Sequence, residues 1–368
     1  MRQSHPVKAK VLDFTRVLAG PLCSMILGDL GADVIKIERP GTGDETRGWG
    51  PPFDSNGQSA YFLSINRNKK SLAADLARAE DRALVMGLLA EADIVIDNFL
   101  PGSLERLGLD RDGILEEYPA LIWCTISGYG PETRRPGYDF VTQAESGWMS
   151  ITGPVDGPPM KVGVALADVV AGKDAAIAIL AALAERGAGL LPRDRRRLDI
   201  SLADSARAAL VNVAQNVMVS GAEAARWGNA HPNLVPYQLF DSADRPFVIA
   251  VGSDDQWQAC ARALDLAELA SDEGLATNAG RIANRERVVE AISERALTRP
   301  ADYWIERLER SGIACGRVRT VSEALAETTA SPQTGMPSSV CGNVRMPPPR
   351  LDEHGQELRS LGWRAFQR

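Results

Sequence analysis

Histidine, cysteine and long hydrophobic runs are scarce in this chain of 368 residues. It has three histidines and five cysteines, and no two cysteines form a CxxC pair. A zinc site or a disulfide framework needs clustered or paired ligands of this kind, so neither is expected and no metal is predicted. Unpaired cysteines fit a reducing compartment, which predicts a cytoplasmic protein.

Two kinds of signal for a membrane are also missing. No segment is long and apolar enough to cross a bilayer, and the opening residues, MRQSHPVKAK, lack the apolar core of a signal peptide. The net charge of -7 argues against nucleic acid as the main partner. A local basic pocket for a small anionic ligand stays compatible with that charge.

Strand and helix patterns alternate through the first part of the chain. This alternation predicts an α/β fold with a mostly parallel sheet covered on both faces. The residues after the first strand, TRVLAGP, contain no GxGxxG, which argues against a nicotinamide dinucleotide site. Strands are expected at 10–14, 33–38, 93–99, 120–130 and 197–202, and helices at 22–31, 71–92, twice within 102–119, after residue 168 and at 203–227.

The pattern changes near GNAHPNLVPYQLF, residues 228–240. Two short strands and three amphipathic helices follow, which predicts a smaller α+β domain over 228–325. The large domain then comprises 1–227 and is completed by the Pro-rich tail, 326–368, whose apolar residues need a partner.

Asp168 is an acid in a segment, GVALADVVAGKDAAIAIL, that otherwise favours burial. A buried carboxylate without partners costs free energy or shifts its pKa. One interpretation is an ordinary helix N-cap, and the other is a catalytic group. An aspartate with its usual pKa is ionised at neutral pH and needs no activating base.

Several long motifs resemble the class III CoA-transferases, the family of formyl-CoA transferase and CaiB. They include VLDFTRVLAGPLCSMILGDLGADVIKIERPGTGDETRGWGPPF, VIDNFLPGSLERLGL, GYDFVTQAESGWMSITG and VGVALADVVAG. Within that family, RWGNAHPNLVPYQLF is most similar to the succinyl-CoA-dependent dicarboxylate transferases.

The resemblance implies a fold, a partner chain and a reaction. It implies a Rossmann-like large domain and a homodimer of two interlocked, ring-shaped chains. It implies transfer of CoA from an acyl-CoA such as succinyl-CoA to a small dicarboxylic acid, with Asp168 as the nucleophile. The intermediates would be an aspartyl anhydride and an aspartyl-CoA thioester.

The resemblance also implies the binding residues. CoA contacts are expected from Leu18, Ala19, Arg39, Asn98, Phe99, Arg106, Tyr138 and Asp139. Substrate contacts are expected from Arg47, Trp49 and Gly252, although a structural ion pair is an equal alternative for Arg47. Ala77 stands where formyl-CoA transferase has a CoA-binding lysine, so Lys69, Lys70 or Arg78 is expected to compensate.

Two other functions stay open. The related α-methylacyl-CoA racemases carry a histidine where Tyr138 stands, and a tyrosine is a poor base at neutral pH, which argues against a racemase. A catalytically silent CoA-binding relative is the other alternative, and the intact Asp168 argues against it.

Overall fold

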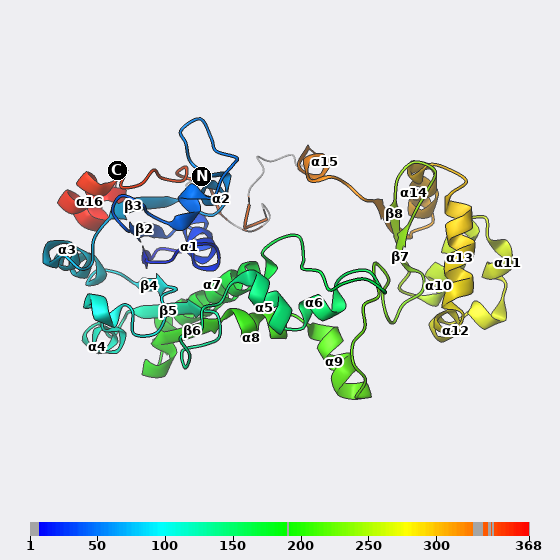
Figure 1. Cartoon of the computed structure of the whole chain (residues 1–368), viewed down its shortest axis with the longest axis horizontal. Helices are drawn as coiled ribbons and strands as arrows, with labels where there is room; N and C mark the ends of the chain where they lie inside the picture. The colour runs from blue at the N-terminus through cyan, green and yellow to red at the C-terminus, as the bar shows by residue number, and fades with distance from the viewer. Residues whose placement is uncertain (1–6, 190, 327–333, 338–339, 341, 368) are drawn as a thin grey trace. The chain divides into compact units, whose positions relative to one another are not determined.

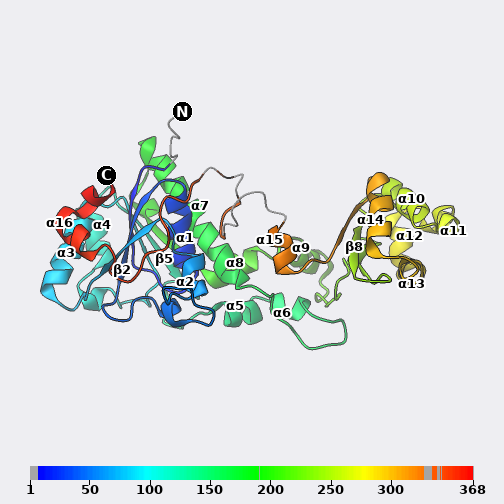
Figure 2. The ribbon, with the colours of Figure 1, turned by 90° about the horizontal axis from the view of Figure 1, so that it is seen from above.

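A computed structural model describes residues 7–189, 191–326, 334–337, 340 and 342–367, with Arg193 described by its backbone alone. The chain divides into two compact units (Figures 1 and 2). Unit 1 comprises Met1–Met149, Lys161–Glu223 and Gln333–Arg368, and unit 2 comprises Ser150–Met160 and Ala224–Pro332. The domain boundaries expected from the sequence stay a prediction.

Unit 1 is built on a six-stranded parallel sheet in the order β3-β2-β1-β4-β5-β6. This confirms the predicted α/β fold. The order reverses between β1 and β4, and open α/β sheets bind ligands at the carboxyl ends of strands at such a reversal. The strands are β1 (Lys10–Asp13), β2 (Asp33–Glu38), β3 (Lys69–Ala73), β4 (Ile94–Asp97), β5 (Ile122–Ser127) and β6 (Arg197–Ser201).

Helices cover both faces of this sheet, because successive strand residues point to opposite sides. Val11 and Ile94 pack with α1 (Ala19–Asp29) and α7 (Leu166–Gly187). Leu12 and Val95 pack with α3 (Ala79–Leu89), α4 (Arg111–Glu117) and α16 (Gly355–Leu361). Figure 2 shows these three helices on one side of the sheet and α1 and α7 on the other. The shorter helices of unit 1 are η1 (Glu45–Gly48), α2 (Ala60–Ser64), η2 (Glu105–Leu107), α5 (Asp139–Glu145), η3 (Arg193–Arg196), α8 (Leu202–Ala208), α9 (Val211–Ser220) and η5 (Gly362–Phe366). The helix α6 (Trp148–Ile151) spans the boundary between the units, and α15 (Val321–Ala326) belongs to unit 2.

The strand β3 was not expected, because its sequence, KKSLA, begins with two lysines. Both lysines are buried and paired: Lys69 Nζ lies 3.1 Å from Asp13 Oδ2, and Lys70 Nζ lies 2.5 Å from Glu357 Oε2. Because β3 takes up residues 69–73, the helix expected over 71–92 begins only at Ala79. The pairing partners come from distant segments, which local sequence patterns do not show.

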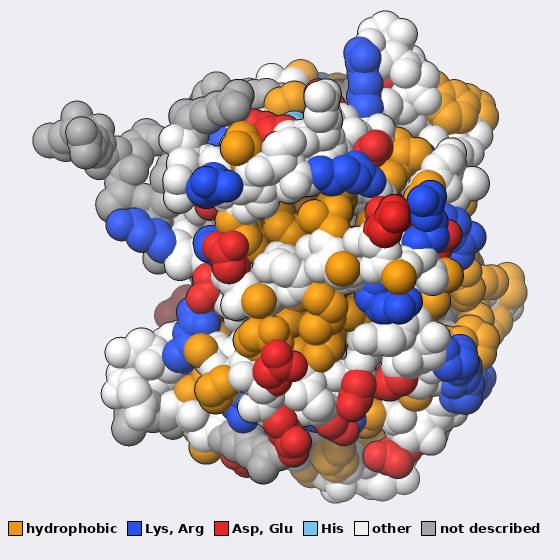
Figure 3. Space-filling view, turned by 90° about the vertical axis from the view of Figure 1, so that its left-hand side faces the viewer, with side chains coloured by type: hydrophobic (Ala, Val, Ile, Leu, Met, Phe, Trp, Pro, Cys, Tyr) orange, Lys and Arg blue, Asp and Glu red, His pale blue; other side chains and the backbone are white. Residues whose placement is uncertain are grey.

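The C-terminal segment packs beside β3. His354 N donates to Ser71 O at 3.2 Å, and Asp352 Oδ1 accepts from Ala73 N at 2.8 Å. Leu358 belongs to the core on this side of the sheet. Figure 3 shows the side of the molecule on which α3, α4 and α16 lie, with hydrophobic side chains gathered in its middle and charged ones around them.

Unit 2 contains a three-stranded antiparallel sheet and helices, which confirms the predicted α+β architecture. Its core includes Trp257 and Trp304, both fully buried. Its elements are β7 (Tyr237–Phe240), β8 (Phe247–Ala250), α10 (Asp254–Ala263), α11 (Ala267–Ala270), η4 (Glu273–Leu275), α12 (Asn278–Ala283), α13 (Arg285–Ala296), α14 (Ala301–Arg310) and β9 (Ala314–Arg317).

Three further findings concern cysteines, membranes and metals. Cys23, Cys124, Cys260 and Cys315 are free thiols, and Cys341 lies outside the described residues. Among the described helices, none has the length and apolar character needed to span a membrane. The described residues contain no cluster of three or more His, Cys, Asp or Glu side chains suited to a metal ion.

Candidate active site

Asp168 is the third residue of α7, and its side chain lines a cavity of about 220 Å³. The N-cap of α7 is Ala165, so the interpretation of Asp168 as an N-cap is wrong. Asp168 is only 9% exposed. Within the described part of the chain, its carboxylate has no hydrogen-bond or ion-pair partner.

The environment of Asp168 disfavours its charged form. Burial, and then the negative charge of Asp139, raise its pKa from 3.8 to about 7. The N-terminus of α7 favours the charge, but it is outweighed. The expectation of a fully ionised carboxylate is therefore corrected: the free enzyme holds Asp168 partly protonated near neutral pH.

We expect Asp168→Asn to stabilise the fold, with a gain that grows with pH. Because the folded pKa of Asp168 is raised, the native state binds more protons than the unfolded chain between about pH 4 and pH 7, and the wild type loses stability as pH rises through that window. Asparagine does not titrate, so the variant avoids this loss, which reaches on the order of 2–4 kcal/mol above pH 7. Thermal unfolding of both proteins from pH 4 to pH 8 measures the difference, and a gain independent of pH would contradict the assignment.

The helices α1 and α7 meet closely next to Asp168. Gly172, one turn further along α7, allows this, because a Cβ there would lie 2.6 Å from Ala19 O. The N-cap of α1, Leu18, makes no side-chain capping bond. Leu18 and Ala19 line the cavity, so an uncapped helix N-terminus lies at its wall.

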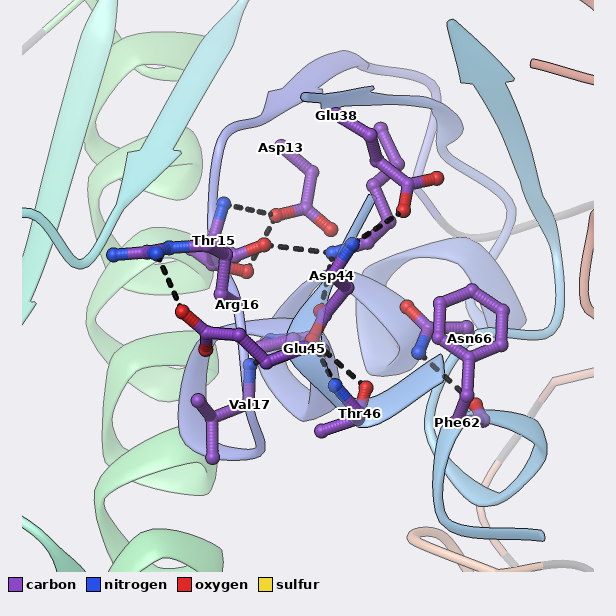
Figure 4. A network of polar contacts seen from close by, with 12 residues as sticks. Asp13, Thr15, Arg16, Val17, Glu38, Asp44, Glu45, Thr46, Phe62 and Asn66 are labelled. Atoms are coloured by element: carbon purple, nitrogen blue, oxygen red, sulfur yellow. Dashed lines mark hydrogen bonds and ion pairs between the residues drawn. The ribbon is translucent and has the colours of Figure 1, made fainter. Parts of the chain in front are cut away.

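A buried polar network holds the loop that leads into α1 (Figure 4). Asp13 Oδ1 accepts from Thr15 N and Oγ1 at 2.9 and 2.5 Å, and fully buried Lys36 donates to Thr15 O at 2.6 Å. Burial raises the pKa of Asp13, but Lys69 and Lys36 outweigh it and lower the pKa to about 2. Val17 follows at φ +70°, a conformation that β-branched residues rarely adopt. The network therefore fixes a loop conformation that the local sequence disfavours.

A second cavity, of about 180 Å³, lies next to the first. Arg16 and Phe99 line both cavities, and Arg39 lines the second. The Arg16 guanidinium lies 5.3 Å from the Phe99 ring centre and 2.7 Å from Glu45 Oε1. Its Nε is buried with no partner among the described residues. Arg16 was not among the residues expected from the sequence, although its place two residues before Leu18 is a usable signal.

The structure brings six of the expected residues together around one cavity: Leu18, Ala19, Asn98, Phe99, Tyr138 and Asp168. Asn98 is held by two bonds to the backbone of Arg16, accepting from its N at 3.0 Å and donating to its O at 2.7 Å. Tyr138 is 57% exposed. These residues come from the end of β4 and the starts of α1, α5 and α7, which explains why they are distant in sequence.

Other expected residues lie elsewhere. Arg106 is exposed and donates to Ser103 Oγ, and Gly252 belongs to unit 2. Trp49 contacts Tyr61 edge to face, with ring centres 5.1 Å apart. Tyr61 was not among the residues expected from the sequence, and its pKa is raised to about 12 by burial and by the charge of Asp168.

Arg47 forms the structural ion pair that the sequence left as an alternative. Its Nη2 and Nε lie 2.7 and 2.9 Å from the carboxylate of Glu38, and its Nη1 donates to Pro349 O at 3.1 Å. Its guanidinium also stacks on Phe62 at 3.7 Å. These contacts occupy the side chain, which favours the structural alternative over a substrate contact for Arg47.

Lys69 and Lys70 are likewise committed to the ion pairs described above, so neither replaces the lysine missing at Ala77. Arg78 is the remaining expected cation, with a side chain that is 67% exposed.

An unpartnered carboxylate in a cavity at the switch point of a parallel sheet is suited to an enzyme that works by covalent or acid–base chemistry. The model of CoA-transferase family III matches residues 8–350, and the chain belongs to this family and is a CoA-transferase.

Named relatives and a solved structure agree with this. The chain is 43% identical over 324 residues to the succinyl-CoA:glutarate CoA-transferase of Mus musculus, covering 86% of this chain and 73% of that protein. It is 39% identical to the succinate–glutarate CoA-transferase of Agrobacterium fabrum, covering 86% and 81%. The crystal structure of a CAIB/BAIF family protein from Brucella suis matches with a TM-score of 0.83 and 39% identity, covering 96% and 97%.

Proposed function

We propose that this enzyme transfers CoA from succinyl-CoA to a small dicarboxylic acid, with Asp168 as the nucleophile. One observation carries the proposal: the unpartnered carboxylate of Asp168 faces a cavity whose wall holds five of the residues expected to contact CoA. The names of the relatives support succinyl-CoA as donor and a dicarboxylate as acceptor.

The first half-reaction has two steps. A carboxylate oxygen of Asp168 attacks the thioester carbonyl of succinyl-CoA, the C–S bond breaks, and a succinyl-aspartyl anhydride and the CoA thiolate form. The thiolate then attacks the aspartyl carbonyl, which releases succinate and leaves CoA bound to Asp168 as a thioester.

The second half-reaction reverses these steps with the acceptor. Its carboxylate attacks the aspartyl thioester, releasing the thiolate and forming a new anhydride. The thiolate attacks the acceptor carbonyl of that anhydride, which gives the product acyl-CoA and regenerates Asp168. The uncapped N–H groups at the start of α1, beside Asp168, are suited to stabilise the oxyanions of these tetrahedral states.

Burial of Asp168 serves this chemistry. A carboxylate that is poorly solvated in its cavity is more reactive than one in water, because less hydration is lost on attack. Arg39 and Arg16 are the cations we assign to the CoA phosphates, since both line the second cavity and guanidinium groups bind phosphate strongly.

We further propose that the enzyme is a cytoplasmic homodimer. Support for a partner comes from α9, which buries none of its residues: Val211, Met218 and Val219 are 70%, 76% and 78% exposed. A cluster of apolar side chains on a helix with no buried face is typical of an interface.

A panel of acids tests the function. With succinyl-CoA as donor, we expect glutarate, hydroxymethylglutarate, itaconate or malate to yield the matching acyl-CoA and one succinate per product, detected by mass spectrometry. Acetate and butyrate should react much more slowly. Exchange of the α-hydrogen of an acyl-CoA with deuterium, without transfer to any acid, would instead indicate a racemase.

A further inference from the structure

The helix that carries Asp168 begins without a capping side chain of its own. Its N-cap, Ala165, has no side-chain oxygen. The missing acceptor comes from α5: Asp139 Oδ1 accepts the hydrogen bond from Ala167 N at 2.8 Å. Ala167 directly precedes Asp168, so this bond fixes the backbone next to the nucleophile.

Gln143 completes the arrangement one turn along α5. It is fully buried, and its Nε2 donates to Asp139 Oδ2 at 2.7 Å. Its Oε1 accepts from Val162 N at 2.9 Å, and Nε2 also lies 3.4 Å from Val164 O. Asp139 and Gln143 therefore hold the segment 162–167 at three points before it enters α7.

We propose that Asp139 and Gln143 are positioning residues that cap α7 in place of Asp168 and so keep its carboxylate free for attack. The inference rests on the proposed role of Asp168. An aspartate in the first turn of a helix commonly bonds to the free N–H groups there. Here one of those groups, Ala167 N, is taken by Asp139, and Asp168 is left unpartnered in its cavity.

The location of Asp139 agrees with this assignment. It was expected to contact CoA, but it does not line either of the two cavities, whereas its neighbour Tyr138 lines the first. Both oxygens of Asp139 are engaged by α7 and Gln143. Its action on the reaction is therefore indirect, through the backbone and charge next to Asp168.

The charge of Asp139 has a second consequence. It raises the pKa of Asp168, so it delays ionisation of the nucleophile as pH rises. The other titratable groups around Asp168 are Tyr61 from α2, whose pKa Asp168 raises in turn, and Arg16, Glu45 and Tyr138 at the cavity wall. Among the described residues, Asp139 is the one whose charge contributes to the raised pKa of Asp168.

Three variants separate position from charge. Asp139→Asn removes the charge and brings an amide nitrogen against Gln143 Nε2, which breaks the hydrogen bond between residues 139 and 143. The double variant Asp139→Asn, Gln143→Glu restores a donor–acceptor pair with its polarity reversed. Gln143→Met removes the bonds of Gln143 to Asp139, Val162 and Val164, and leaves in place the charge of Asp139 and its bond to Ala167 N.

We expect turnover to fall by about 10- to 100-fold in Asp139→Asn and in Gln143→Met, since small displacements of a reacting group have effects of this size. The double variant should recover a large part of that loss. The acid limb of the kcat/KM profile should move to lower pH in Asp139→Asn and stay at its wild-type position in Gln143→Met.

Wild-type turnover and an unmoved acid limb in Asp139→Asn would overturn the proposal. So would a loss of turnover in Asp139→Asn that the double variant does not relieve. Infrared difference spectra of the free enzyme give a readout without turnover: a protonated carboxyl band, absent in Asp168→Asn, should titrate at lower pH in Asp139→Asn. If that shift is seen but the wild type transfers no CoA, the proposed function fails, and Asp139 is left with its effect on the pKa of Asp168 alone. If the wild type transfers CoA but the band does not shift and turnover is unchanged in Asp139→Asn, the positioning inference fails and the proposed function stands.

Discussion

Asp168→Asn is expected to abolish CoA transfer, with a loss of turnover on the order of 10⁴-fold or more, the scale seen when a covalent nucleophile is removed. Asparagine has nearly the same shape as aspartate, but its amide cannot form the anhydride or the thioester. Since Asp168 makes no hydrogen bond among the described residues, the substitution breaks none. Affinity for CoA should therefore change little.

A matched control lies on the same helix. Asp174 is six residues further along α7 and is partly buried, so Asp174→Asn makes the same chemical change without touching the cavity lining. Its turnover should stay within about twofold of the wild type, because a substitution away from the cavity usually has a small effect. Substantial turnover in a mass-verified Asp168→Asn preparation would remove Asp168 as the nucleophile.

Much of the fold follows from local sequence patterns. Each run that forms β1, β2, β4 or β5 is built around Val, Ile or Leu and bounded by turns, so these runs are interpreted as buried strands. β3 could not be read in this way, because Lys69 becomes acceptable in a core only next to Asp13. That pairing depends on the sheet order, which places β3 at one edge.

The position of the nucleophile was available from motifs, but its electrostatics were not. From the sequence alone, Asp168 is expected to have the usual pKa of an aspartate. The rise to about 7 depends on burial and on Asp139, which is 29 residues away. The ion pair of Arg47 could not be predicted from local sequence either, because Arg47 reaches Glu38 through the turn between β2 and η1.

The positioning pair had a weak local signal that went unused. Asp139 and Gln143 are four residues apart, the spacing that places two side chains on one face of a helix. What the spacing does not give is the third partner, the N–H of Ala167, because it belongs to a segment that folds back against α5.

Incubation with succinyl-CoA alone should leave a covalent group on Asp168. The first half-reaction needs no acceptor acid. The succinate that it releases can only reverse it, so Asp168 is distributed between the free carboxylate, the anhydride and the CoA thioester. Intact-protein mass spectrometry should show an added mass of CoA, and the modified peptide should contain Asp168. The same sample of Asp168→Asn should show neither.

Hydroxylamine distinguishes an acylating intermediate from a bound ligand. It attacks the aspartyl carbonyl of the thioester or of the anhydride, releases CoA or succinate respectively, and leaves a hydroxamate on Asp168, which should inactivate the enzyme in proportion to labelling. Without succinyl-CoA the free carboxylate does not react, so enzyme treated with hydroxylamine alone is the control. Normal transfer with no donor-dependent modification of this peptide would indicate direct exchange between two bound substrates, and Asp168 would then act through its charge alone. Direct exchange requires succinyl-CoA and the acceptor acid in the site at the same time. Initial rates at varied concentrations of donor and acceptor would then give intersecting rather than parallel double-reciprocal lines.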